Sequence, residues 1–307
     1  MPETVEVRHT LNEPQARQLA NVSKSVPMME QITPRWLIAS LSWVPVEAGV
    51  YRLNKVKPTR PGTRTIECHA DVELDLPEIY VDYEEKPREY LLTAVTSVLD
   101  VQTRISDLYR SPHDQIREQL RLMIEKVKER QEEALINNRE YGLLNNIAPS
   151  MKVKARTGAP TPDDMDELVA KVWKEPSFFL AHPRAIAAFG RECTYRGVPP
   201  PTVTMFGSPF MTWRGIPLVP CDKVPVKAET TDILLMRTGE KKQGVVGLFQ
   251  PGLPGEVSPS LSVRFMGIDH KAIASYLISL YCSVVVLTED ALGVLENVHV
   301  DQYHEYK

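Results

Sequence analysis

The chain has 307 residues, 25% of them charged, and a formal net charge of −4. Its composition therefore gives no sign of electrostatic capture of nucleic acid. This length is enough for one large domain or two modest ones with a substantial apolar core. The 25 prolines exceed the usual share and predict many turns and irregular connections.

Neither a secretory signal nor membrane insertion is predicted. Residues 1–31 carry acids and bases throughout and lack an apolar segment. The best apolar stretch, residues 276–287, is about half the length needed to cross a bilayer. The cysteines at positions 68, 193, 221 and 282 form no CxxC pair and no zinc-ligand spacing, which favours buried thiols in a reducing compartment. We therefore expect a cytoplasmic protein.

The first 31 residues are polar, mixed in charge and without sustained periodicity. They predict either a disordered tail or an extended arm that orders only against neighbouring subunits. The apolar run at residues 26–29 favours docking of the distal part of this segment.

Residues 32–56 predict a short helix, an extended connector and the first strand of a hairpin. Thr33 is a possible N-cap, Pro34 suits the first helical position, and an apolar run from Trp36 follows. Pro45 removes a hydrogen-bond donor and biases the residue before it toward extended backbone. A second extended run starts at Gly49.

A long two-stranded hairpin is predicted between residues 49 and 76. Residues 50–56 form its first strand, and the proline- and glycine-containing residues 57–63 form its turn. The returning strand, residues 64–74, places alternate apolar side chains on one face. Since an isolated hairpin is marginal in water, this one needs a surface to lie on, which would be its own core in a monomer or the next subunit in an assembly.

Two helices are expected next. Apolar residues between Leu91 and Leu108 recur at helical spacing. Ser111 then provides a cap and Pro112 a first turn for a long helix that extends to about Asn138. Its charge-rich face, including residues 125–133, predicts a partly exposed spine whose charges are solvated.

The second half of the chain mixes helices and strands. A helix starts near Thr161 with Asp163 and Asp164 in its first turn, and a short one spans 182–190 and ends at Gly190. Residues 197–225 are rich in turn formers. Further elements are expected as strands at 232–237, 243–248, 261–266 and 282–287 and a helix at 272–280. Without a regular βαβ repeat, the fold class is α+β.

The sequence offers no constellation for catalysis. Phosphate-binding loops, zinc-protease motifs and nucleophile elbows are missing from it. Adjacent strand residues Cys68 and His69 point to opposite faces and cannot easily share a metal. His299 and His304 sit in a charged tail that predicts solvated side chains. We therefore expect no enzyme activity, no cofactor and no metal, and a structural or interaction protein fits better.

Residues 32–56 resemble the N-terminal signature of family 2 encapsulin shell proteins. In that signature a T-x-R-W-L helix leads to W-V-x-V and then to G-x-Y-R-x-N. Residues 205–222 resemble the A-domain pattern of capsids, in which an aromatic residue, Gly-(Ile/Leu)-Pro-Val and an acidic residue follow one another. The order of elements resembles the Hong Kong 97-type phage capsid fold with its N-arm, E-loop, P-domain and A-domain.

This resemblance implies domain boundaries and interface residues. The N-terminal arm and short helix would take residues 1–46, the E-loop hairpin 47–85, the P-domain with its spine helix 86–160 and 282–307, and the A-domain 161–281. Side chains expected between subunits lie in the E-loop and N-arm: Trp36, Tyr51, Arg52, Asn54, Ile66 and Val72. Cargo-binding residues stay unknown.

The resemblance also implies a function. The chain has no room for the cyclic-nucleotide-binding domain of one branch, so it resembles family 2A, whose shells commonly enclose a cysteine desulfurase of sulfur metabolism. Pyridoxal phosphate would then belong only to that cargo enzyme. The expected assembly is an icosahedral homo-oligomer of about sixty copies. The alternatives are a phage-type major capsid protein and, further away, a small-oligomer enzyme or ligand-binding protein.

Overall fold

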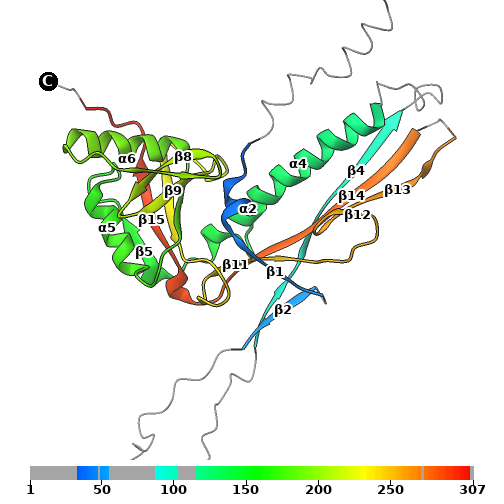
Figure 1. The fold of residues 1–307 in the computed structure, drawn as a ribbon, viewed down its shortest axis with the longest axis horizontal. Coiled ribbons are helices and arrows are strands. Elements are labelled where there is room, and N and C mark those ends of the chain that lie inside the picture. The colour runs from blue at the N-terminus through cyan, green and yellow to red at the C-terminus, as the bar shows by residue number, and fades with distance from the viewer. Residues whose placement is uncertain (1–32, 48, 55–86, 103–114, 271–272, 305–307) are drawn as a thin grey trace, which may run out of the picture.

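A computed structural model describes residues 33–47, 49–54, 87–102, 115–270 and 273–304 (Figure 1). The molecule is elongated and has two modules. The compact module carries helices α5 and α6 around a seven-stranded sheet, and the long module is a narrow sheet with helix α4 lying along it. This mixture of helices and strands confirms the α+β class.

The sheet of the compact module has a mixed strand order, β5-β15-β10-β6-β9-β8-β7. Its strands are β5 (Lys152–Lys154), β6 (Phe178–Ala181), β7 (Thr202–Met205), β8 (Ser208–Trp213), β9 (Ile216–Pro220), β10 (Thr230–Met236) and β15 (Leu292–His299). β6 is buried along its whole length, as expected for a central strand. The helices are α5 (Pro162–Lys171) and α6 (Pro183–Tyr195).

The sheet of the long module has the order β1-β11-β14-β13-β12, with β4 also paired to β14. Its strands are β1 (Ser42–Pro45), β4 (Thr93–Gln102), β11 (Val245–Phe249), β12 (Glu256–Ser258), β13 (Leu261–Ile268) and β14 (Ile273–Val286). Helix α4 (Gln115–Asn137) packs on it through Val127, which joins a buried cluster with Ile278 and Leu280.

Smaller elements complete the described fold. Helix α2 (Trp36–Ser40) precedes β1, and β2 (Val50–Leu53) pairs antiparallel with β3 (Arg88–Leu91). Single 3₁₀ turns lie at η2 (Leu143–Asn145), η3 (Pro149–Met151) and η4 (Glu289–Ala291). In the part of the chain that the structure describes, no helix is long and apolar enough to span a membrane.

Several predicted elements are confirmed because their signals are local. Thr161 caps α5 in a reciprocal capping box with Asp164, whose buried carboxylate accepts from the Thr161 backbone. The long helix is present as α4, although Ser111 and Pro112 lie outside the described residues. Strands at 230–236, 245–249 and 261–268 also match expectation, and Cys193, Cys221 and Cys282 are free, buried thiols.

Two predicted helices are wrong within the described residues. The stretch from Leu91 onward forms β3 and β4, and residues 273–280 belong to β14. β14 pairs with β4 over ten positions and with β13 over seven. A strand between two neighbours, with α4 on one face, buries side chains on both faces, so its apolar spacing does not alternate strictly.

Other local expectations need correction. α6 does not end at Gly190 but continues to Tyr195, because a glycine inside a helix is tolerated and this one packs closely against Met211. The turn-rich residues 197–225 contain the three strands β7, β8 and β9. The N-cap of α2 is Arg35, in a left-handed conformation, and not Thr33.

The returning strand of the predicted hairpin, residues 64–74, lies outside the described residues. The described partner of β2 is β3, which lies some 35 residues further along the chain. The predicted domain boundaries stay a prediction.

Candidate functional site

Helix α2 lies where the two modules meet (Figure 1). Its Leu37 is fully buried in the main core. The Trp36 ring stacks on Phe206, with 5.6 Å between centroids, and meets Phe210 edge-on at 5.3 Å. These contacts dock α2 on the β7–β8 hairpin of the compact module.

Three glutamates of α4 hold the other side of α2. The Thr33 hydroxyl donates to Glu129 at 2.7 Å, and its backbone N–H donates to the same carboxylate at 3.1 Å. Arg35 pairs with Glu125 at 2.7 Å and with Glu129 at 3.0 Å. These contacts fix the two residues Thr33 and Arg35, which lead into α2, against α4.

The third glutamate, Glu132, is 1% exposed and accepts a hydrogen bond from the Leu37 N–H at 3.2 Å. Burial raises the pKa of Glu132 to about 7, against a partial lowering by that hydrogen bond. Helix α2 is thus held by a carboxylate whose pKa lies near neutrality.

Lys223 links this junction to the compact module. Its ammonium contacts Glu129 at 2.9 Å and Asp222 at 2.7 Å, and Asn137 of α4 donates to the Lys223 carbonyl at 2.9 Å. Burial disfavours the charge on Lys223, but the two carboxylates outweigh it and raise its pKa. Burial likewise tends to raise the pKa of Glu129, yet hydrogen bonds from Lys223 and Thr33 lower it. This ion cluster stays charged.

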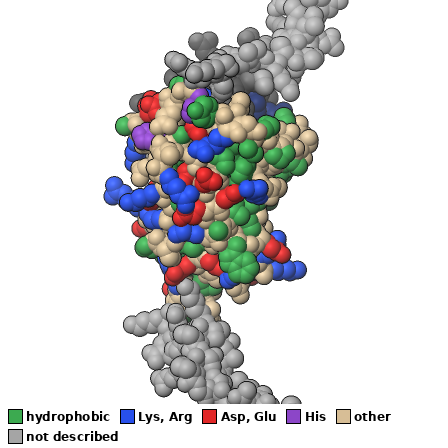
Figure 2. All heavy atoms as spheres, turned by 90° about the vertical axis from the view of Figure 1, so that its left-hand side faces the viewer, with side chains coloured by type: hydrophobic (Ala, Val, Ile, Leu, Met, Phe, Trp, Pro, Cys, Tyr) green, Lys and Arg blue, Asp and Glu red, His purple; other side chains and the backbone are tan. Residues whose placement is uncertain are grey.

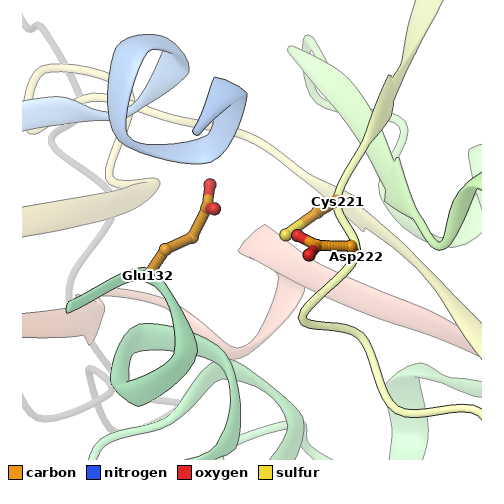
Figure 3. A group of neighbouring side chains, drawn as sticks. All are labelled: Glu132, Cys221 and Asp222. Atoms are coloured by element: carbon orange, nitrogen blue, oxygen red, sulfur yellow. The ribbon is translucent and has the colours of Figure 1, made fainter. Parts of the chain in front are cut away.

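Glu132, Cys221 and Asp222 bring three potential metal-binding atoms within 4.8 Å of one another. In Figure 3, Glu132 rises from α4 toward α2, while Cys221 and Asp222 face it from the segment after β9. Both carboxylates already have partners within the chain: Glu132 accepts from the Leu37 N–H, and Asp222 accepts from the Lys223 ammonium. Burial raises the pKa of the Cys221 thiol to about 12, so it is neutral. The trio is explained as part of the junction.

The sequence does not predict this junction. The charge-rich face at residues 125–133 of α4 predicts solvated side chains, and that prediction is wrong for Glu125, Glu129 and Glu132. Their spacing of four and then three residues places them on one side of the helix, which was the available signal. Their partners lie about 95 residues earlier in the chain, so the sequence could not identify them.

The described interface candidates contact their own chain. Tyr51 donates from its hydroxyl to Glu240 at 3.1 Å and packs beside the buried Val46 cluster. Arg52 pairs with Glu89 at 2.9 Å on the exposed face of β2 and β3. Asn54 lines a cavity of about 700 Å³ beside the β2 end. Trp36 packs as described above.

None of these intrachain contacts tests a role between subunits, which stays a prediction for Trp36, Tyr51, Arg52 and Asn54. Ile66 and Val72 lie outside the described residues. Among the four described candidates, Tyr51 and Asn54 line the same cavity.

Exposed apolar side chains gather at the free end of the long sheet. Phe265, Met266 and Ile268 of β13 are each more than half exposed, and so is Val98 of β4. Exposed apolar surface at the end of a narrow sheet is typical of a contact with another protein.

The compact module presents a different surface. Figure 2 looks onto this module, where charged side chains of both signs cover the face and apolar ones gather toward one edge.

Residues 300–304 lie on α6, which corrects the prediction for His304. Its ring contacts Glu192 and stacks on Tyr195 with 4.1 Å between centroids, so the side chain is not fully solvated. Arg191 donates to the carbonyls of Val300 and Gln302 at 2.8 and 3.1 Å. These contacts attach residues 300–304 to the compact module.

Comparison with known proteins identifies the family. The family model of the "Type 2A encapsulin shell protein SrpI-like" family matches residues 54–302. The type 2A encapsulin shell protein SrpI of Synechococcus elongatus is 66% identical over 292 residues, covering 95% of each chain.

Solved structures agree. The holo-SrpI encapsulin complex of the same organism matches with a TM-score of 0.83 and 63% identity over 97% of this chain and all of that one. A virus-like particle from Pyrococcus furiosus matches with a TM-score of 0.53 and 11% identity, covering 92% of this chain and 96% of that one, which shows the shared fold alone.

These matches confirm the Hong Kong 97-type capsid-like fold and decide between the capsid-like alternatives. The relatives are named as shell proteins and not as enzymes. The chain belongs to the type 2A encapsulin shell protein family.

Proposed function

We propose that this chain assembles into a closed icosahedral cage of about sixty copies that encloses a cargo enzyme in the cytoplasm. The observation that carries the proposal is the likeness, at a TM-score of 0.83 and 63% identity, to the solved holo-SrpI encapsulin complex. The exposed apolar end of the long sheet supports it, because such surface is stabilised when a second copy covers it.

Size-exclusion chromatography combined with electron microscopy tests the cage directly. We expect hollow particles of one size that contain this chain. A monodisperse species of one or two subunits would overturn the proposal.

The cargo we propose is a cysteine desulfurase that depends on pyridoxal phosphate and acts in sulfur metabolism. Its support is the family to which the chain belongs. The shell supplies enclosure and binds no cofactor in this proposal. Particles purified from the native cell should contain a second protein with a pyridoxal absorbance band, whereas particles produced from this chain alone should be colourless.

Cysteine turnover measured on both preparations separates shell from cargo. We expect activity only in the native particles. Turnover by cargo-free shells would contradict the non-enzymatic role, and a different enclosed enzyme would change the cargo assignment alone.

The E-loop contact is proposed as the interface that closes the cage. Tyr51→Asp or Ile66→Asp should stop assembly, since burying such side chains contributes roughly 1.5–3 kcal/mol each and recurs at every interface. Circular dichroism should show that the variant subunits stay partly folded. Normal particles from both variants would remove the hairpin from the interface.

A further inference from the structure

A cavity of about 510 Å³ opens between α2, α4 and the sheet of the long module. Its walls are mainly apolar. The apolar lining residues are Pro34, Ile38, Ala39, Trp43, Phe249, Pro259 and Leu280. Cavities of about 300–1,000 Å³ with apolar walls hold small ligands or inserted side chains. An apolar occupant is therefore expected in this cavity.

The start of the described chain stands at this cavity. Pro34 and Arg35 are part of its lining, and Thr33 is fixed beside it by Glu129. Residues 26–32 directly precede these positions in the sequence. At about 3.3–3.6 Å per extended residue, Met29 can reach any wall of the cavity. A segment tethered this closely is present at the cavity at an effective concentration in the millimolar range. A separate partner would have to reach that concentration in solution to compete with it.

Composition also matches the segment to the cavity. Five of the seven residues 26–32 are apolar: Val26, Pro27, Met28, Met29 and Ile32. Methionine side chains are flexible enough to fill irregular apolar space. The only charge is Glu30, and the cavity lining includes the cations Arg35 and Lys128. Lys128 is held only loosely, 3.7 Å from Glu125.

We propose that residues 26–32 of this chain dock in this cavity of their own subunit. The docked segment would cover Trp43 and Leu280 and fix the place where the first 25 residues leave the subunit. This inference concerns a single subunit and does not depend on the cargo or on the size of the cage.

Paired cysteines test it on the full-length protein, with Cys68 replaced by serine because the other three native thiols are buried. Met29→Cys is combined with Ser258→Cys, which lies in the cavity lining, and the matched control combines Met29→Cys with Val257→Cys. Val257 is the adjacent residue, is 64% exposed and is not part of the lining. A second cavity pair, Met29→Cys with Lys128→Cys, places the thiol on α4 and guards against a folding failure of the first.

Mild oxidation, a non-reducing gel and peptide mass spectrometry give the readout. We expect at least fivefold more disulfide in the cavity pairs than in the control, formed within one chain, and several-fold less when Met28→Asp is added. A disulfide between two chains would overturn the proposal in favour of a neighbouring copy's segment. Equal yields in cavity and control pairs would overturn it in favour of an unrelated occupant or none.

Discussion

Glu132 is a carboxylate buried where α2, α4 and the segment after β9 meet. Its pKa in the folded chain, about 7, lies above the ordinary 4.5. The folded state therefore holds the proton more tightly than the unfolded state does. The stability from this group is fully present below pH ~4.5 and is lost as the pH rises through 7.

Glu132→Gln removes this titration and keeps an oxygen that can accept from Leu37. We expect the variant to unfold like the wild type at pH 4.5 and to be more stable at pH 8, by up to about 3 kcal/mol, because the pKa of Glu132 rises from 4.5 to about 7 on folding. Thermal unfolding of both proteins across this range measures the difference.

Glu133→Gln is the matched control, because Glu133 is the adjacent residue of α4 and is exposed. It should leave the pH dependence unchanged. A Glu132→Gln variant that is less stable than the wild type at pH 8 would show that the folded chain needs the charged carboxylate.

Single residues were predictable from sequence where their partners are local. The start of α5 near Thr161 was predictable because its signals, including Asp164 in the first turn, lie within three residues. Thr33 was misassigned as a cap because its partner, Glu129, is 96 residues away. A cap motif shows that a side chain is able to cap a helix, but the hydrogen-bond partner it has in the fold depends on tertiary contacts.

At the scale of elements, the capping box of α5 supports a short helix against the compact sheet. Thr161→Ala removes the acceptor for the Asp164 N–H and one partner of a fully buried carboxylate. We expect a loss of about 1–2 kcal/mol in the free energy of unfolding, measured with denaturant. Thr194→Ala in α6 is the control, since its exposed hydroxyl bonds only to the Gly190 carbonyl, and it should change stability by less than about 0.5 kcal/mol.

The contact between β1 and β11 depends on a residue without a side chain. A Cβ at Gly247 would lie 2.7 Å from the Trp43 ring, which is held in place by its hydrogen bond to the Ile38 carbonyl. Gly247→Ala should therefore cost about 1–3 kcal/mol of stability. The same substitution in a Trp43→Leu background should cost clearly less, and equal costs in both backgrounds would exclude the clash as the cause.

Elements were predictable from sequence when caps or isolated alternation marked them, as in α4, α5 and β10. β4 and residues 273–280 of β14 were mistaken for helices because each pairs along its length with a neighbour that the sequence does not reveal, whereas the strand predicted at 282–287 is present as the end of β14. Long-range pairing overrides local spacing in such strands. The family resemblance predicted the fold more accurately than the individual helix and strand predictions did. It depends on the motif in residues 33–54 and not on hydrophobic periodicity.

At the scale of the whole molecule, the exposed apolar end of the long sheet is a surface on which another subunit would be expected to pack. Phe265→Ser combined with Ile268→Ser should prevent particle formation while the subunit stays folded, because both side chains are more than half exposed in the single chain. Electron microscopy and circular dichroism report the two properties. Lys241→Ser, in an exposed turn, should assemble normally, and normal assembly of the double variant would place the contacts elsewhere.

Strand order sets the time at which a newly made chain can fold. β1 is completed only by β11, whose register partner Val246 follows Ser42 by about 200 residues, and β15, the last strand of the chain, lies between β5 and β10 inside the compact sheet. At about 5–20 residues per second, ribosomes deliver β11 roughly 10–40 seconds after β1. In a nascent subunit β1 thus stays without β11 until residues 245–249 have been made, and the compact sheet stays incomplete until β15 has followed. A chain that ends before residue 292 lacks β15, so β5 and β10 have no strand between them in the compact sheet.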